Sequence, residues 1–195
     1  MDQTIKLKRN FGELTKTGSN IVQAPQCTAD MNIIPLQKKY LEETIKMVNE
    51  VFPADVNAMY SPEKSFRLSL EYEEEPELLN KSYMRRIGYW IMQDDTDEVI
   101  GVTGLYRREN DPSDLVWLGW YCVRADQRGK GLGRRLLEWT INIAREEGYK
   151  KLELYTSTDP NEARAQELYE KLGFKIVGEE KSGGAYKTLY REKIL

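Results

Sequence analysis

The sequence predicts a mixed α/β fold, in which a mostly antiparallel central sheet is flanked by helices. Two observations predict this class. Short runs of branched and aromatic residues alternate with segments whose apolar residues recur at helical spacing. In addition, three strand-like runs follow one another before the next helix, which is typical of hairpin-built sheets. The chain of 195 residues is long enough for one domain with a single core.

The first half of the chain is expected to form two helices and four strands. Pro53 should end the first helix, while Phe66 and Leu70, four residues apart, mark one face of the second. The polar stretch Asp94–Glu98 separates two apolar runs and indicates a hairpin turn. The expected helices are 36–52 and 62–72, and the expected strands are 32–35, 86–93, 99–107 and 115–124.

The second half contains a compact helix start. Asp159 suits the N-cap, Pro160 suits the first helical position, and Glu162 stands where a capping box needs a glutamate. The two expected helices begin at Leu132 and Asp159 and end near Gly148 and Gly173, with strands at 151–157, 174–179 and 186–194.

Residues 1–30 are polar and weakly patterned, so we expect an N-terminal extension before a domain spanning 31–195.

Composition also limits the binding partners and the cellular compartment that we expect. The net charge of −3 shows no basic excess, and no nucleic-acid partner is expected. No apolar run approaches the roughly 20 residues of a membrane span, and the N-terminus lacks a secretory core. Cys27 and Cys122 lie far apart without metal-ligand spacing, so we expect a cytoplasmic protein without disulfides.

The chain contains no histidine. Imidazole is the commonest general base and a frequent zinc ligand. Its absence removes Ser–His and Cys–His nucleophile pairs and most zinc sites, and no metal is expected. Any chemistry must therefore use carboxylates, tyrosine, lysine, backbone amides or water.

The most informative segment is Val123–Leu137, where a strand, a glycine-rich loop and a helix follow one another. Three glycines in the loop allow the backbone to approach a ligand closely. The first amides of the helix are free donors at the positive end of its dipole, which suits a pyrophosphate. We call residues 128–134 the phosphate cradle. Its positive charge comes from Arg128, Lys130, Arg134 and the adjoining Arg135.

Other glycine-rich motifs fit less well. A Walker loop needs Gly-x-x-x-x-Gly-Lys-Ser/Thr, and the chain holds no such string. The dinucleotide fingerprint Gly-x-Gly-x-x-Gly opens a first βαβ unit, whereas Gly-x-Gly-x-Gly occurs here late in the chain. A glycine-rich turn that merely caps a surface helix is the remaining structural alternative.

Two motifs resemble the GNAT family of N-acetyltransferases. Arg128-Gly129-Lys130-Gly131-Leu132-Gly133 matches that family's Arg/Gln-x-x-Gly-x-Gly/Ala signature. The stretch Ala165–Phe174 (AQELYEKLGF) is similar to its Ala-x-x-Leu-Tyr-x-x-x-Gly-Phe segment. The resemblance runs from about Met31 to Leu195 and implies the acyl-CoA N-acyltransferase fold, with acetyl-CoA as co-substrate and no metal.

The resemblance also implies roles for individual residues. In the family, the strand before the cradle separates from the next parallel strand, and the pantetheine arm of acyl-CoA enters the gap. Tyr169 matches the tyrosine that often protonates the leaving thiolate, and a phenol with a pKa near 10 can donate a proton at neutral pH. Asn161 lies one residue before the position of a pantetheine-binding asparagine, where this chain has Glu162. The implied cofactor contacts are Tyr121, Cys122, Val123, Arg128, Gly129, Lys130, Gly131, Leu132, Gly133, Arg134 and Asn161.

The general base is not evident from the sequence. Some family members have a glutamate on the strand before the cradle, where this chain has Trp117. We expect a water chain to take the proton of the amine, with Asp114 as an alternative base. Cys122 as an acyl-carrying nucleophile is disfavoured, because no histidine activates it.

The sequence does not identify the amine that accepts the acetyl group. A small amine, an amino acid, a peptide N-terminus and a protein lysine all agree with the sequence. The acidic run 71–77 is either a solvated loop or an attractor of a cationic amine. An alternative function is a catalytically idle acyl-CoA-binding sensor, and edge strands near the C-terminus leave a homodimer open. Aromatic residues that pack in the core or line an acceptor pocket are Tyr60, Phe66, Tyr89, Trp90, Trp117 and Trp120.

Overall fold

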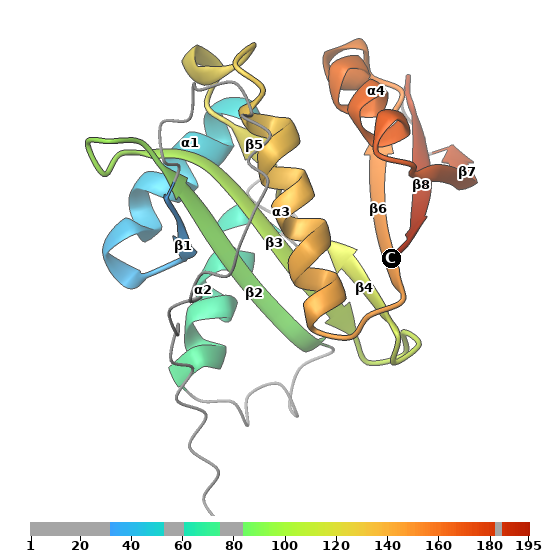
Figure 1. Ribbon diagram of the computed structural model, residues 1–195, viewed down its shortest axis with the longest axis horizontal. Coiled ribbons are helices and arrows are strands. Elements are labelled where there is room, and N and C mark those ends of the chain that lie inside the picture. The colour runs from blue at the N-terminus through green and yellow to red at the C-terminus, as the bar shows by residue number, and fades with distance from the viewer. Residues whose placement is uncertain (1–31, 53–60, 75–83, 182–184) are drawn as a thin grey trace, which may run out of the picture.

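The computed structural model describes residues 32–52, 61–74, 84–181 and 185–195 (Figure 1). The predicted N-terminal extension, Cys27 and Tyr60 therefore lie outside the described residues. The helices are α1 (Leu41–Val51), α2 (Pro62–Glu74), α3 (Leu132–Glu146) and α4 (Ala163–Lys171), with 3-10 turns at Lys38–Tyr40, Ala125–Gln127 and Pro160–Glu162. The strands are β1 (Asn32–Pro35), β2 (Met84–Gln93), β3 (Val99–Arg108), β4 (Leu115–Leu118), β5 (Cys122–Val123), β6 (Lys151–Ser157), β7 (Lys175–Lys181) and β8 (Lys187–Ile194).

The sheet confirms the predicted fold class. Its strand order is β1-β2-β3-β4-β6-β8-β7, and β5 pairs with β3 beyond the end of β4. Within the described residues, β4 and β6 form the one parallel pair, and every other pair is antiparallel. The parallel pair exists because α3 carries the chain back across the sheet as a crossover.

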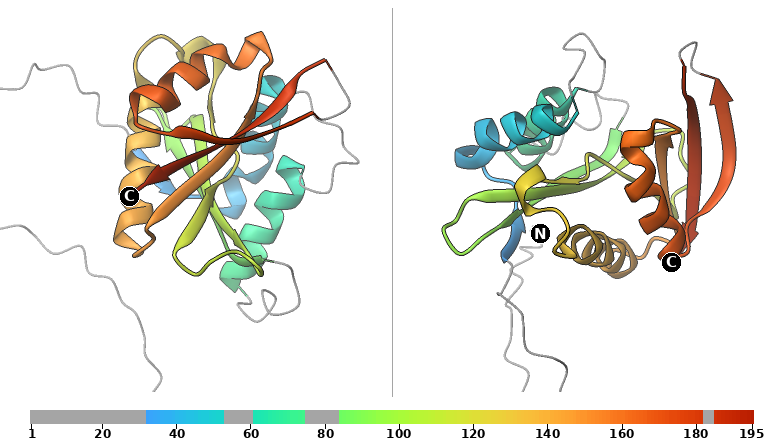
Figure 2. Two further views of the ribbon diagram at one scale, coloured as in Figure 1. Left: turned by 90° about the vertical axis from the view of Figure 1, so that its right-hand side faces the viewer. Right: turned by 90° about the horizontal axis from the view of Figure 1, so that it is seen from above.

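Helices cover both faces of the sheet (Figure 2). α1 and α2 pack on one face around Phe66, Tyr89 and Val48. α3 and α4 lie on the other face, where Leu137 and Tyr169 share a core cluster. The buried side chains of α3 recur at helical spacing, at Leu136, Leu137, Thr140, Ile141 and Ala144.

One predicted strand, 115–124, is divided in the structure. β4 stops at Leu118 and β5 resumes at Cys122, and both pair with β3. The three residues between them, 119–121, stand opposite only two residues of β3, 103–104. This arrangement is a β-bulge, which bends the strand and redirects its side chains.

The ring of Tyr89, on β2, lies against this bulge. A Cβ atom at Gly104 would lie 2.3 Å from Cδ1 of the ring, and one at Gly119 would lie 2.7 Å from the hydroxyl oxygen. The ring therefore rests on bare backbone at both glycines, and Phe66 of α2 packs edge-on against it at 4.7 Å between centroids. Glycine inside a strand pattern signals such a close approach, and Gly119 carries that signal in the sequence.

Beyond the bulge, β4 and β6 diverge, as the family resemblance implied. Their pairing runs only from Leu115 opposite Lys151 to Trp117 opposite Glu153. β6 then continues to Ser157 as a partner of β8, while the chain after β4 turns toward β3. Two strand edges therefore face each other across a gap between the two parts of the sheet.

The start of α4 confirms one capping prediction and corrects another. Asp159 is the N-cap of the turn that leads into α4, and its carboxylate accepts from the Asn161 N–H at 2.9 Å. The predicted capping box is wrong. The Glu162 carboxylate accepts from Thr156 and Ser157, at the end of β6, because this strand end presents three donors beside it.

Three further findings bear on the sequence predictions. The strand β7 lies at an edge of the sheet, with Ile176 and Val177 about half exposed. Glu71 and Glu74 belong to α2, while part of the acidic run lies outside the described residues. Among the described helices, none is long and apolar enough to cross a membrane.

Candidate active site

The phosphate cradle combines left-handed glycines with free helix amides. Gly129 and Gly131 have φ of 81° and 78°, values that L side chains rarely adopt. A Cβ atom would meet nothing at either position, so backbone conformation rather than space requires glycine. The Arg135 N–H donates to Gly131 O at 3.1 Å, so the preceding amides of the helix lack an intrahelical partner. These amides belong to Leu132, Gly133 and Arg134.

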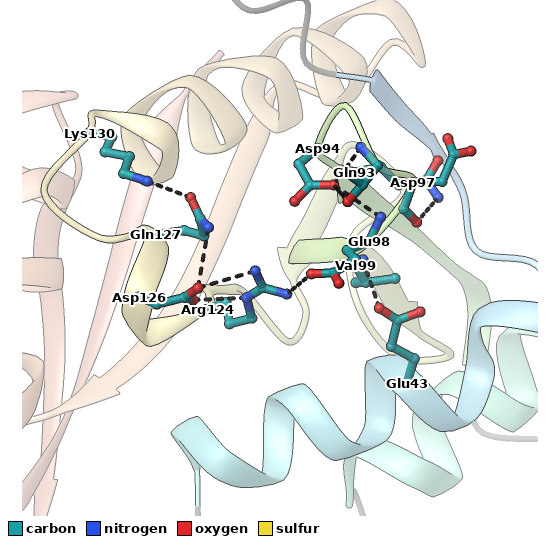
Figure 3. Close-up of polar contacts among 11 residues, drawn as sticks. Glu43, Gln93, Asp94, Asp97, Glu98, Val99, Arg124, Asp126, Gln127 and Lys130 are labelled. Carbon is teal, nitrogen blue, oxygen red and sulfur yellow. Dashed lines mark hydrogen bonds and ion pairs between the residues drawn. The ribbon is translucent and has the colours of Figure 1, made fainter.

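A chain of polar contacts fixes the cradle loop to the β2–β3 turn (Figure 3). Lys130 Nζ donates to Gln127 Oε1 at 2.7 Å, and Gln127 in turn donates to Asp126. Arg124 donates to Asp126 at 2.8 Å and to Glu98 at 2.9 Å. Arg128 Nε donates to Val123 O at 3.2 Å, which holds the cradle to β5. The basic side chains of the loop are thus partly anchored to the protein, and the amides and helix dipole face outward.

A cavity of about 320 Å³ passes through the gap between β4 and β6. It joins the face covered by α1 and α2 to the side chains beside α4. The described residues that line it are Phe52, Ser65, Met84, Ile87, Tyr89, Tyr106, Arg108, Leu118, Gly119, Trp120, Tyr121, Leu154, Tyr155, Thr156, Ser157, Glu162, Tyr169 and Thr188.

Tyr169 forms part of the cavity wall where the sequence placed the general acid. Its ring packs edge-on against Phe174 at 5.8 Å and lies 6.3 Å from the ring of Tyr121. Burial raises the pKa of the phenol, and the negative charge of Glu162 raises it further. The hydroxyl therefore keeps its proton throughout the neutral range and is suited to donate it.

Tyr121 connects the bulge to the cradle. Its hydroxyl donates to Gly133 O at 2.7 Å, and burial raises its pKa. A Cβ atom at Gly133 would lie 3.1 Å from this oxygen, so the glycine leaves room for the contact. The bulge thus places Tyr121 between the first turn of α3 and the ring of Tyr169.

Cys122 is unsuited to nucleophilic chemistry. The thiol is buried, and burial raises its pKa to about 12, although the Arg128 charge lowers it somewhat. At neutral pH almost no thiolate exists, which agrees with the prediction that Cys122 carries no acyl group.

Glu162 lies at the cavity, and Asn161 does not. Asn161 is exposed, and its amide donates to the Asp159 carboxylate, so the structure shows it as part of the helix cap. Its contact with the cofactor stays a prediction. Glu162 accepts from the Ser157 N–H at 3.1 Å and from the Ser157 hydroxyl at 2.5 Å. Sequence reasoning assigned Glu162 to a capping box and missed this position.

Carboxylates near β4 do not reach the cavity. Asp114 is exposed and precedes β4 at the end remote from the bulge, and it is absent from the cavity wall. Asp111 accepts from the Arg108 N–H at 2.7 Å and from Trp117 Nε1 at 3.1 Å. Glu109 forms an ion pair with Arg85. The geometry gives no support to Asp114 as the base.

The predicted aromatic residues divide between cavity and core. Tyr89 and Trp120 line the cavity, and Trp120 Nε1 donates to Ser65 Oγ of α2 at 3.3 Å. Trp90 packs edge-on against Trp139 of α3, on the opposite face of the sheet. Phe66 and Trp117 are buried, and Trp117 stacks on Tyr106. Among the described residues, no group of histidine, cysteine or carboxylate side chains could hold a metal ion.

Comparison with known proteins agrees with this geometry. The model of the acetyltransferase (GNAT) family matches residues 54–174, more than half of the chain. The chain belongs to the GNAT family. The cradle and the whole motif around Tyr169 that suggested the family lie within the matched segment.

Individual relatives in the GNAT family are distant. N-acetyltransferase 8B of Rattus norvegicus is 30% identical over 105 residues, covering 52% of this chain and 46% of the relative. The peptidyl-lysine N-acetyltransferase YjaB of Escherichia coli is 29% identical over 111 residues, covering 57% and 65%. The chain thus spans about half to two thirds of the length of these relatives. A crystal structure from the GNAT family, from Desulfovibrio desulfuricans, superposes with a TM-score of 0.67 at 16% identity, covering 84% of this chain and 98% of the other.

The residues present fit the co-substrate of GNAT enzymes. The left-handed glycines and free amides of the cradle suit a pyrophosphate. The edge of β5 and that of the outer half of β6, which pair with no described strand on this side, suit an extended arm that carries amide groups. The cavity between the bulge and the outer half of β6 reaches Tyr169.

Proposed function

We propose that this protein is an N-acetyltransferase that transfers the acetyl group of acetyl-CoA directly to a primary amine. One observation carries the proposal: a single cavity joins Tyr169, the gap between β4 and β6, and the face covered by α1 and α2. An acetyl donor held by the cradle and an amine on the opposite side of the gap would meet inside it. Holding both reactants in one geometry supplies a large part of the rate enhancement.

Tyr169 is the general acid in this proposal. The amine nitrogen forms a bond to the carbonyl carbon, the carbon–sulfur bond breaks, and Tyr169 gives its proton to the leaving sulfur. The phenol is suited to this task because its burial and Glu162 both favour the protonated form. Amides of 132–134 and the side chains of Arg128 and Lys130 would hold the phosphates, with Tyr121, Cys122 and Val123 along the arm.

A water chain takes the proton that the amine releases. Direct attack on a thioester needs only a neutral amine, so a strong protein base is unnecessary. The cavity is continuous with polar groups at Ser157 and Thr156, which can hold water in place. These groups are more suitably placed than Asp114.

The assignment is tested by ligand binding and then by turnover. Acetyl-CoA at 100 times its dissociation constant should stabilise the protein by roughly 2.7 kcal/mol and raise the melting midpoint by roughly 5–10 °C. ATP and NAD serve as controls. Thiol release on addition of amines then measures transfer. A melt that acetyl-CoA leaves unchanged would argue against the proposal.

Binding without transfer to any amine would favour the alternative of a catalytically idle acyl-CoA sensor. The absence of a carboxylate on β4 is the feature that agrees with that alternative. The domain division, a cytoplasmic location, a homodimer and the absence of nucleic-acid or membrane partners stay predictions from the sequence.

A further inference from the structure

Glu162 is a carboxylate in the cavity wall to which the acetyl transfer proposed above gives only an indirect task. It is half-buried at the N-cap of α4. No other carboxylate side chain occurs among the described residues of the wall, and β4 holds none either. A proton acceptor supplied by the described wall therefore has to come from the start of α4.

Three donors at the end of β6 hold the Glu162 carboxylate in place. The Ser157 N–H donates to Oε2 at 3.1 Å, and the Ser157 hydroxyl donates to Oε1 at 2.5 Å. The Thr156 hydroxyl also donates to Oε2. A carboxylate accepts about four hydrogen bonds, so an acceptor position remains on Oε1. The carboxylate is thus held in one direction without being fully occupied.

The Ser157 hydroxyl connects this carboxylate to the cavity, which Ser157 lines. The hydroxyl donates its proton to Glu162 and accepts from the Asp159 N–H at 3.2 Å. A hydroxyl oxygen has two lone pairs, so the second is open to a water molecule in the cavity. A proton can therefore pass from water to Ser157 while Ser157 gives its own proton to Glu162.

Glu162 and Tyr169 lie on one side of α4. They are separated by nearly two helical turns, or about 10 Å along the axis. Side chains of a helix lean toward its N-terminus, so the Tyr169 ring extends toward Glu162. Both side chains line the cavity. A proton acceptor and a proton donor can thus serve one reaction centre from the same helix.

The other titratable groups near this carboxylate keep their charge through the neutral range. Burial raises the pKa of Tyr89, Tyr106, Tyr121 and Tyr169, and that of the neighbouring Cys122 thiol. Arginine stays protonated, both in the wall and on β8, where Arg191 donates to Glu170 of α4. The Asp159 carboxylate caps the turn before α4. The titratable side chains of the described wall besides Glu162 are Tyr89, Tyr106, Arg108, Tyr121, Tyr155 and Tyr169.

We propose that Glu162 accepts the proton that the amine releases, and that cavity water and the Ser157 hydroxyl carry the proton to it. The inference rests on the proposed acetyl transfer and names the end of its water chain. It assigns the base to the start of α4, whereas the sequence directed attention to β4 and Asp114.

Each proton has a defined course in this proposal. One proton of the bound ammonium ion passes through water and Ser157 to Glu162. The neutral nitrogen then forms its bond to the carbonyl carbon, the carbon–sulfur bond breaks, and Tyr169 gives its proton to sulfur. The second proton that the nitrogen loses returns to the phenol, and Glu162 releases its proton to bulk water. The net products are the amide, the thiol and one proton.

Two aromatic amines of different basicity test the proposal. Phenylethylamine is about as basic as lysine, with a pKa of about 10.4, whereas the α-amine of L-phenylalanine amide has a pKa of about 7.7–8.0. At about pH 7.5 the first is almost entirely an ammonium ion, and roughly a third of the second is neutral. Glu162→Gln should therefore lower kcat for phenylethylamine by about 100-fold and kcat for phenylalanine amide by less than about threefold. The loss with phenylethylamine should shrink as the pH rises toward about 10.

Further variants assign the effect to one path. Ser157→Ala keeps the backbone N–H that binds Glu162 and should reproduce the selective loss of kcat. Combining it with Glu162→Gln should add no more than about a twofold loss, because both changes interrupt the same path. Glu167→Gln is the matched control and should leave both rates unchanged, since Glu167 is an exposed residue of α4 that pairs with Lys171 outside the cavity wall.

The outcomes separate this inference from the proposed function. Equal losses of kcat with both amines would show that Glu162 only holds β6 against α4, and would overturn the inference. A loss confined to KM would also overturn it, because the charge would then merely attract the ammonium ion. Wild-type kcat in Ser157→Ala would exclude the path through Ser157. Binding of acetyl-CoA by the wild type without transfer to either amine would count against the proposed function itself.

Discussion

The two sides of the cavity are built from different kinds of sequence. The proposed cofactor side consists of the cradle and α4, and most of the residues assigned to it lie within a few positions of one another in each segment. The proposed acceptor side takes scattered residues from α2, β2, β3, the bulge and Phe52, which follows α1. One contiguous strand–loop–helix segment can encode a phosphate site, because backbone amides do most of the binding. A side-chain pocket depends on the tertiary packing of distant segments.

This difference predicts that changes on each side affect different quantities. Substitutions on the cofactor side should alter acetyl-CoA binding or the chemical step whatever the amine is. Substitutions on the acceptor side should alter stability or the KM for the amine. The four predictions that follow run from the largest expected effect to the smallest.

Tyr169→Phe should lower kcat by about 100- to 10,000-fold, because the leaving sulfur loses its proton donor. Acetyl-CoA binding, measured by the melting shift, should change little. Tyr149→Phe is the matched control, since Tyr149 is a partly buried tyrosine just after α3, outside the cavity wall. Equal losses in both variants would show that the Tyr169 effect is structural.

Gly104→Ala should lower the free energy of unfolding by about 1–3 kcal/mol, because the new Cβ would collide with the Tyr89 ring. Urea denaturation measures the loss. Gly178→Ala is the control, since a Cβ there meets its nearest neighbour at an ordinary 3.6 Å. Adding Tyr89→Leu to Gly104→Ala should restore part of the stability, and a failure to do so would mean that Tyr89 does not press on the bulge.

Gly131→Ala and Gly148→Ala form a matched pair at the two ends of α3. Both glycines have left-handed φ, 78° and 87°, and a Cβ meets nothing at either. Each substitution should therefore cost about 1–2 kcal/mol of stability. Only Gly131→Ala should weaken acetyl-CoA binding, by about tenfold. Equal affinities in the two variants would remove the cradle from the binding site.

The fourth prediction is that kcat stays constant over a pH range in which an exposed phenol would begin to lose its proton. Burial and Glu162 raise the pKa of Tyr169 above its ordinary value near 10, so the donor stays protonated as the pH rises. At saturating substrate, kcat should not decline between roughly pH 8 and pH 10. A decline in that range, absent in a thiol-release control without enzyme, would contradict a buried phenol as the proton donor.

Local patterns were sufficient to predict most of the fold. The helix 132–146 and the strand 151–157 follow from periodicity, because each buries one face against the sheet. The division of the strand was missed because LVWLGWYCVR is apolar almost throughout and only Gly119 marks the bulge, while pairing with β3 decides where the strand breaks. The left-handed glycines of the cradle and the position of Tyr169 beside the cavity agree with two short sequence motifs, while the roles of these residues stay predictions.

Residues defined by tertiary contacts escaped prediction. Glu162 has the spacing of a capping box, yet the donors at Thr156 and Ser157 on the neighbouring strand bind its carboxylate. Arg108 follows an apolar run and reads as the start of a loop, and only the stacking of Trp117 on Tyr106 shows why its side chain lies along the sheet. The local periodicity of the sequence does not reveal either of these contacts.

The divergence of β4 and β6 has a consequence for solubility. An open sheet ordinarily presents its unpaired edges at its two ends, and these edges invite association with strands of other chains. Here a further pair of edges lies inside the molecule, along β5 and the outer half of β6, where they face each other. An arm bearing amide groups would satisfy both at once, whereas a strand of another protein would have to enter between β5 and β6 to reach them. The protein thereby keeps hydrogen-bonding backbone ready for a ligand while withholding it from other proteins.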